Sequence, residues 1–188
     1  KKQDLYMGLF IAILVALFMP IPALEGMQTG FLFHPDWWWA SSFIKFAILS
    51  TLGEMIGLRI KTGEYNHNTF GILPRAIVWG FLGIGIKMAF VIFAVGTPAL
   101  LIKLFGVEEA GAAMAATDIF DAMDKGLGGI RLLDAFLISS FMNLIFAPVF
   151  MTFHKITDTH ITDNGGTIKG FFSPIKFSEI FPKLNWFV

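Results

Sequence analysis

Four long apolar stretches separated by shorter polar segments set the pattern of this chain. They cover residues 5–24, 40–60, 71–96 and 132–153. A helix needs about 20 mostly apolar residues to cross a bilayer, and each stretch reaches that length. The pattern therefore predicts an all-α, polytopic helical membrane protein with about four transmembrane helices.

The first apolar stretch has a second interpretation. Lys1 and Lys2 precede it, and Pro20 and Pro22 lie near its end. A basic start, an apolar core and small residues near Ala23 are also features of a secretory signal peptide. The apolar core is long for such a peptide, so we favour a first transmembrane helix.

The segment between the third and fourth stretches is less apolar. Residues 97–105 are expected to form a short connection, and residues 106–130 are rich in Ala and Gly. Asp118, Asp121 and Asp124 recur there every three residues, which predicts a short amphipathic helix outside the membrane, ended by the glycines that follow. These carboxylates raise the alternative of a cation site. No calcium-loop pattern is present, so we favour a solvated acidic face.

Residues 1–154 are expected to form the membrane domain and residues 155–188 a polar tail. Asp163-Asn164-Gly165-Gly166 is a turn signal between two short segments, and it predicts a small β-hairpin. Ser173-Pro174 indicates the start of a helix. The apolar side of that helix suits it to lie on a membrane surface, and it consists of Phe177, Ile180, Phe181 and Leu184.

Composition supports a membrane protein and excludes several functions. Hydrophobic residues make up 55% of the chain and charged residues 15%, whereas soluble domains are nearer a quarter charged. The formal net charge is zero, which indicates no nucleic-acid partner. Cys is absent, which excludes disulfides and thiolate metal sites. No nucleophile–base pair, phosphate loop or metal-ligand cluster occurs, so we expect neither an enzyme nor a bound cofactor or metal.

Five polar residues inside the apolar stretches are the candidate functional residues. Charges within a bilayer are costly, so they face protein or water and usually mark function. The helical rise of about 1.5 Å per residue places them in two layers. Lys87 and Asp134 form the outer layer, and Glu54, Arg75 and Asn143 form the inner one. The structural alternative is a set of ion pairs that only holds the helices in register.

Two groups of small residues are candidates for helix packing. Gly53 and Gly57 form a G-x-x-x-G pattern, which allows two helices to approach closely. Ala76, Gly80 and Gly83 are spaced so that they share one face of the third helix. That face is expected to contact protein rather than lipid.

Two histidines follow the fourth stretch. His154 and Asp158 are one helical turn apart if the helix continues, and His160 lies close by. Histidine side chains are common metal ligands, but this pair carries no ligand pattern. We expect these residues to form an exposed polar cap.

Charge asymmetry predicts how the helices are oriented. Lys and Arg concentrate on the side that holds both termini, and Asp and Glu on the other side. The positive-inside rule therefore places both termini on the cytoplasmic side. Trp37, Trp38 and Trp39 mark a membrane–water boundary, where indole rings prefer to lie.

The second to fourth stretches also carry short motifs of a known family. These are L-G-E-M-I-G-L-R-I around Gly53-Glu54, the run L-P-R-A-I-V-W-G-F-L-G-I-G, and Ala147-Pro148. With them the chain resembles, from Ser42 to Phe153, the small peroxisomal membrane protein and Mpv-seventeen family of four-helix membrane proteins. The C-terminal helix of that family, with its Trp-Pro and Asn-Phe signature, does not occur in residues 155–188.

The resemblance implies a membrane pore, or a modulator of small-solute passage, in a bacterial inner membrane or an organellar inner membrane. The layered polar residues lead to the same expectation, a path for small solutes or ions through a helix bundle. The alternative is a non-catalytic accessory subunit of a larger membrane complex. The expected partners are the lipid bilayer and either further copies of the chain or other membrane subunits.

Overall fold

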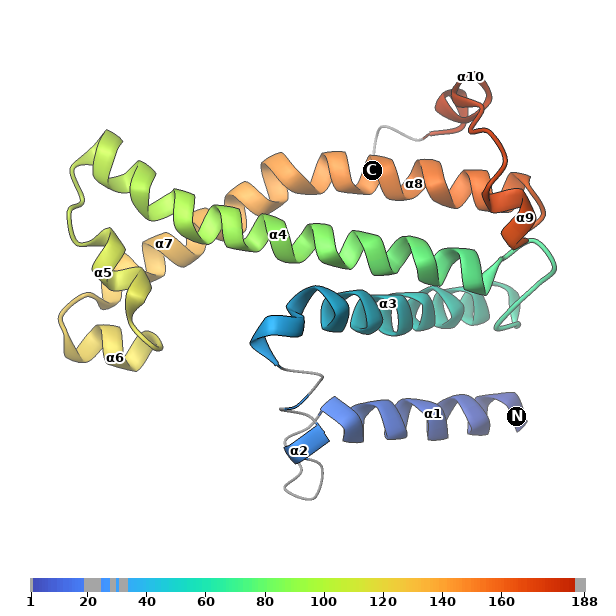
Figure 1. The fold of residues 1–188 in the computed structure, drawn as a ribbon, viewed down its shortest axis with the longest axis horizontal. Coiled ribbons are helices and arrows are strands. Elements are labelled where there is room, and N and C mark those ends of the chain that lie inside the picture. The colour runs from blue at the N-terminus through green and yellow to red at the C-terminus, as the bar shows by residue number, and fades with distance from the viewer. Residues whose placement is uncertain (1, 19–24, 28–29, 31–33, 185–188) are drawn as a thin grey trace.

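The chain folds into helices in the computed structural model shown in Figure 1. The structure describes residues 2–18, 25–27, 30 and 34–184, and these ranges contain no strand. The all-α prediction is therefore confirmed for the described residues. Of the first apolar stretch, residues 19–24 lie outside them.

Three long helical segments form the body of the molecule. They are α3 (Trp38–Thr62), α4 (Ile72–Phe105) and a composite helix made of α7 (Gly128–Phe141), a π-helical turn (Met142–Phe146) and α8 (Ala147–Asp163). Two of these segments, Ile72–Phe105 and Gly128–Asp163, are long and apolar enough to cross a membrane.

The remaining elements are short or peripheral. They are α1 (Lys2–Phe18), α2 (Glu25–Met27), a 3-10 turn (Pro35–Trp37), α5 (Ala110–Ala115), α6 (Ile119–Asp124), α9 (Ile168–Phe171), α10 (Phe177–Ile180) and a second 3-10 turn (Phe181–Lys183).

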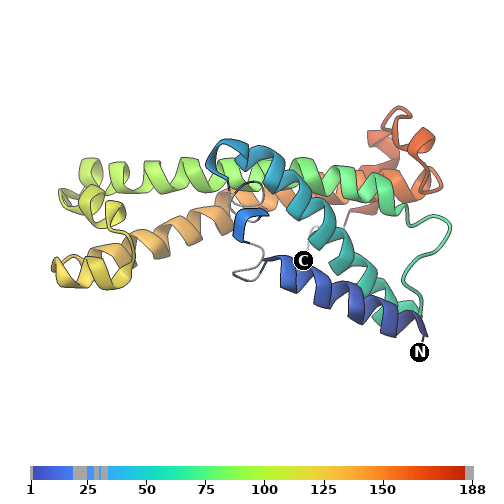
Figure 2. The ribbon, with the colours of Figure 1, turned by 60° about the horizontal axis from the view of Figure 1, so that its bottom comes forward.

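Helix α4 is the central element, as Figures 1 and 2 show. It packs against α3 on one side and against α7 and α8 on the other. The composite helix runs antiparallel to α4: Trp79 lies against His154 near one end, and Phe93 lies near Phe141 further along. This register fixes which side chains of the two helices meet.

The predicted connection at residues 97–105 is wrong, because α4 continues through Pro98 to Phe105. Proline removes one helical hydrogen bond, but burial of Thr97, Pro98 and Leu101 holds this part of the helix in place. The helix ends at Gly106, whose φ of 68° favours glycine.

Pro148 lies within the composite helix, where a proline removes a helical hydrogen bond and favours a bend. The structure has a π-helical turn at Met142–Phe146, directly before Pro148 in the first turn of α8. Such turns accompany bends in helices. The helix then continues to Asp163, so the predicted boundary between residues 154 and 155 falls inside α8.

Helices α5 and α6 form a small head at one end of the molecule (Figure 1). Asp118 caps α6 by accepting a hydrogen bond from the Asp121 N–H at 2.9 Å. Hydrogen bonds from Lys125 and the Thr117 N–H hold the pKa of the Asp121 carboxyl below its usual range. Gly128, expected to end the amphipathic helix, instead begins α7.

The predicted β-hairpin at residues 163–166 is wrong. Gly165 and Gly166 adopt positive φ values of 75° and 66°, and they end α8 instead of joining two strands. A Cβ at Gly166 would meet the backbone N of Gly71 at 2.8 Å. The turn therefore needs glycine, because it lies directly against the loop that enters α4.

The first helix lies beside α3 and is held at its start by polar contacts. Asp4 accepts hydrogen bonds from Arg59 at 2.9 and 3.0 Å and from the Tyr65 hydroxyl at 3.1 Å. Lys45 lies 5.9 Å from the centre of the Phe18 ring. The two helices are therefore antiparallel.

The small residues divide into two groups. A Cβ at Gly80 would lie 2.5 Å from the Phe43 ring, and a Cβ at Gly83 would meet Cβ of Phe46. These two glycines allow α3 to approach α4 closely, whereas Ala76 on the same face is half-buried. The G-x-x-x-G pattern has no close neighbour within the described structure, because Cβ atoms at Gly53 and Gly57 would meet nothing within 4 Å, and its role in helix packing stays a prediction.

We predict opposite effects for alanine at these two kinds of glycine. Gly83→Ala should lower the free energy of unfolding by about 1–3 kcal/mol, because the added methyl group overpacks the contact with Phe46. Gly53→Ala should be neutral or stabilising by up to about 1 kcal/mol, since alanine favours a helix and has room there. Thermal unfolding of the purified protein measures both. Equal effects would contradict the close packing of α3 on α4.

Candidate functional site: a charge cluster between three helices

Arg75 in the first turn of α4 is the centre of a buried polar cluster. Its Nη1 donates to Oε2 of Glu54 at 2.5 Å and pairs with the Asp158 carboxylate. Its Nε donates to the carbonyl oxygen of Phe70 at 2.6 Å, and Nη2 donates to Oγ1 of Thr162 at 3.3 Å. One guanidinium therefore joins α3, α4 and α8.

Glu54 of α3 is held by three helical partners. Besides Arg75, its Oε1 accepts a hydrogen bond from Nε1 of Trp79 at 2.8 Å and lies 3.3 Å from Nε2 of His154. The Trp79 and His154 rings lie 4.4 Å apart between their centres. The carboxylate therefore ties α3 to both α4 and α8.

The cluster is tightly packed. The Arg75 side chain is only 9% exposed, and the side chains of Glu54, His154 and Asp158 are each below a quarter exposed. The space among the α4 and α8 side chains is too small for a water molecule. Within the described structure, Nδ1 of His154 is buried and has no hydrogen-bond partner. Among the described residues, the cluster thus places one guanidinium between two carboxylates and leaves one buried imidazole nitrogen without a hydrogen bond.

Of the five sequence-predicted residues, the structure brings Glu54 and Arg75 together. Asn143 is placed elsewhere: it is exposed and donates to the carbonyl oxygen of Ser139 at 2.8 Å. It lines a groove of about 280 Å³ together with Arg131 and Met114. The inner layer is therefore a pair rather than a triad.

The outer layer of Lys87 and Asp134 is not formed. Lys87 is exposed, Asp134 is fully buried, and no ion pair joins them among the described residues. The observed register places Ala89 beside Ile138 and Met142, so Asp134 lies near the level of Thr97, about 15 Å along the bundle from Lys87. The depth estimate failed because both helices extend further than the apolar stretches suggested.

Sequence reasoning missed three members of the cluster: Trp79, His154 and Asp158. His154 and Asp158 were expected to form an exposed cap, but α8 continues past them and turns both toward α4. Their spacing of four residues was the signal that could have revealed them. It becomes informative only when α8 is known to continue beyond residue 153.

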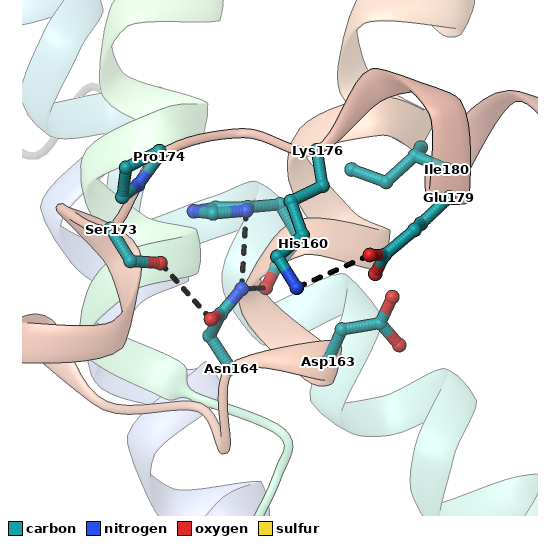
Figure 3. Close-up of a pocket in the computed structure, with 8 residues that line it drawn as sticks. All are labelled: His160, Asp163, Asn164, Ser173, Pro174, Lys176, Glu179 and Ile180. Carbon is teal, nitrogen blue, oxygen red and sulfur yellow. Dashed lines mark hydrogen bonds and ion pairs between the residues drawn. The ribbon is translucent and has the colours of Figure 1, made fainter.

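A second polar pocket lies where the tail folds back on α8, and Figure 3 shows its lining. Asn164 donates from Nδ2 to Nδ1 of His160 at 3.2 Å, and its Oδ1 accepts from the Ser173 hydroxyl at 3.0 Å. Nε2 of His160 donates to the carbonyl oxygen of Phe171 at 3.1 Å. These bonds satisfy the polar atoms of the pocket and anchor the tail.

Among the described residues, no group of three His, Cys, Asp or Glu side chains is placed to hold a metal ion. Comparisons with protein-family models, with curated proteins and with solved structures find no match to this chain. The geometry of the Arg75 cluster is therefore the main indication of function.

Removing the central charge tests whether this cluster is a tightly coupled unit. Arg75→Met should lower the free energy of unfolding by about 3–5 kcal/mol, because it leaves Glu54 and Asp158 buried without their main partner. Arg59→Met, which removes a largely solvent-accessible pair with Asp4, is the matched control and should have little effect. Chemical or thermal unfolding in detergent compares the two. Similar losses for both variants would contradict this view of the cluster.

Proposed function

We propose that this chain is a four-span helical membrane protein of a bacterial or organellar inner membrane that forms or modulates a path for small solutes or ions. The cluster of Glu54, Arg75, His154 and Asp158 acts as the closed gate of that path. The single observation that carries this proposal is the buried charge cluster, whose members come from three different helices.

Charged groups inside a membrane carry a large free-energy cost. Each such group costs several kcal/mol unless it is paired, so a cluster of four polar side chains is expensive to keep in an apolar bundle. A merely structural bundle would be held as well by apolar packing. Charged clusters of this kind therefore favour a role in moving ions or polar solutes.

The geometry supports a closed state. No water-sized space remains among the α4 and α8 side chains, so solute cannot pass between them in this conformation. Arg75 and Glu54 connect α3, α4 and α8, and a small shift of α3 or α8 would break several charged hydrogen bonds together. Such shared bonds make a two-state element, as gating requires.

The family resemblance supports the same proposal. Glu54 lies within L-G-E-M-I-G-L-R-I, and Arg75 lies within L-P-R-A-I-V-W-G-F-L-G-I-G. Two residues that lie within these motifs, Glu54 and Arg75, are thus partners in the cluster.

The length of α4 favours a second candidate function, an accessory subunit of a larger membrane complex. Its 34 residues correspond to about 51 Å, whereas the apolar layer of a bilayer is about 30 Å thick. The apolar surface continues along the part of α4 that α3 does not cover. Its exposed residues there are Val91, Ile92, Val95, Leu100, Leu104 and Phe105. A partner subunit would cover this excess.

Flux in liposomes distinguishes the two functions. Purified wild-type protein should pass small ions or solutes slowly, and Glu54→Gln should increase the flux severalfold, because it weakens the bonds to Arg75 and His154 while keeping the side-chain shape. Lys87→Met removes an exposed charge outside the cluster and is the matched control, with flux equal to wild type. Fluorescent dye release and ion-selective electrodes measure both.

Folded wild-type and Glu54→Gln proteins that both pass nothing would contradict the path. In that case, copurification of a membrane partner from the native membrane would support the accessory subunit.

A further inference from the structure

Two polar side chains in the region where α4 faces α7 are fully buried. Asp134 of α7 is 0% exposed and Thr97 of α4 is 1% exposed. Among the described residues, neither carboxylate oxygen of Asp134 has a hydrogen-bond partner. The hydroxyl of Thr97 has none either. Buried polar groups are nearly always paired, so two unpaired ones in one interface need an explanation.

The threonine is unusual even for this chain. Five other helical threonines donate their hydroxyl to the carbonyl oxygen four residues earlier; these are Thr62, Thr152, Thr157, Thr159 and Thr162. Among the residues that the structure describes, Thr97 and Thr51 are the buried threonines whose hydroxyls have no partner. The Thr97 hydroxyl is therefore free to bind something other than its own helix.

The register of the helices places Thr97 and Asp134 at similar levels of the α4–α7 interface. Ala89 and Phe93 of α4 pack in one cluster with Ile138 and Met142 of the composite helix. Thr97 lies one turn beyond Phe93 on the same face, and Asp134 lies one turn before Ile138. Because the two helices are antiparallel, these two steps lead to the same level of the interface.

A third oxygen lies at this level. Pro98 has no N–H, so the carbonyl oxygen of Ala94 receives no hydrogen bond from the residue four positions later. Helical carbonyl groups point toward the C-terminal end of the helix, which directs this oxygen toward Thr97. Ala94 also packs in the α4–α7 interface.

The nearest charge does not satisfy these oxygens. Arg131, one turn before Asp134, attracts it electrostatically. Its Nη1, however, donates to the carbonyl oxygens of Ala113 and Met114 at 3.3 and 2.5 Å, at the end of α5. The guanidinium thus binds the head, and the rest of the surrounding cluster is apolar.

We propose that Asp134, Thr97 and the Ala94 carbonyl form a binding site for a dehydrated monovalent cation, specifically Na⁺. One carboxylate, one hydroxyl and one carbonyl are hard oxygen ligands, which suit a hard cation. A single carboxylate balances a single positive charge, so a divalent ion would leave net charge in a buried site. The bound ion joins α4 to α7 and is separate from the Arg75 cluster, so the site stands whether or not that cluster is a gate.

Thermal unfolding of the full chain in detergent tests the site. The probes are NaCl, KCl and N-methylglucamine chloride at equal ionic strength. Saturating Na⁺ should raise the melting temperature of the wild type by about 5 °C or more over N-methylglucamine, as expected for a ligand that binds only the folded state. K⁺ should raise it less. Asp134→Asn and Thr97→Val should abolish the Na⁺ response.

Matched variants keep the test decisive. Thr152→Val, which removes a hydroxyl bonded to its own helix, should retain the full Na⁺ shift. Thr97→Ser should restore the shift that Thr97→Val loses, and this pair decides the matter if Asp134→Asn does not fold. An unchanged melting temperature of the wild type in Na⁺ would overturn the proposal. A Na⁺ shift that persists in Thr97→Val would also overturn the proposal. So would an Asp134→Asn protein that is more stable than the wild type and does not respond to Na⁺, because that result would assign Arg131 or a proton as the partner of the carboxylate.

Discussion

The buried guanidinium of Arg75 is the constraint on which this end of the molecule depends. A charge that is 9% exposed must be paired on every side. Glu54, Asp158, Thr162 and the carbonyl of Phe70 surround it, so α3, α8 and the loop before α4 must all converge there. The close approach of Gly71 and Gly166 follows from the same convergence.

The two ends of α4 solve the problem of buried charge in different ways. At its start, Arg75 lies among two carboxylates and an imidazole, and the guanidinium finds its partners within the protein. Near its other end, Asp134 of the facing helix has no hydrogen-bond partner within the described part of the chain, and the nearest guanidinium binds α5 instead. The first arrangement suits an element that breaks and re-forms. The second suits a site completed by an ion.

The sequence predicted the helices well and their register poorly. Apolar stretches located the cores of α3, α4 and the composite helix, and the inner-layer argument paired Glu54 with Arg75. Helix ends decide the register, however, and they depend on burial around Pro98 and on the continuation of α8, which hydrophobicity does not reveal. That error produced the incorrect pairing of Lys87 with Asp134.

Local signals failed where tertiary contacts decided the outcome. Gly165 and Gly166 were assigned to a hairpin because the sequence could not show that a loop near residue 70 lies against them. His154 and Asp158 were assigned to a solvated cap because their partners, Glu54 and Arg75, lie on other helices. Conversely, Gly80 and Gly83 were recognised correctly, since a small-residue face predicts a close neighbour without naming it.

The most direct test of the central claim measures whether the Arg75 cluster holds α3 and α8 together. The chain has no Cys, so two introduced cysteines at the exposed positions Ile60 and Met151 carry the only spin labels. Pulsed electron paramagnetic resonance in lipid should give one narrow distance for the otherwise wild-type protein, and a second, longer distance in the Glu54→Gln background. An identical single distance in both backgrounds, with both proteins folded, would contradict the gate.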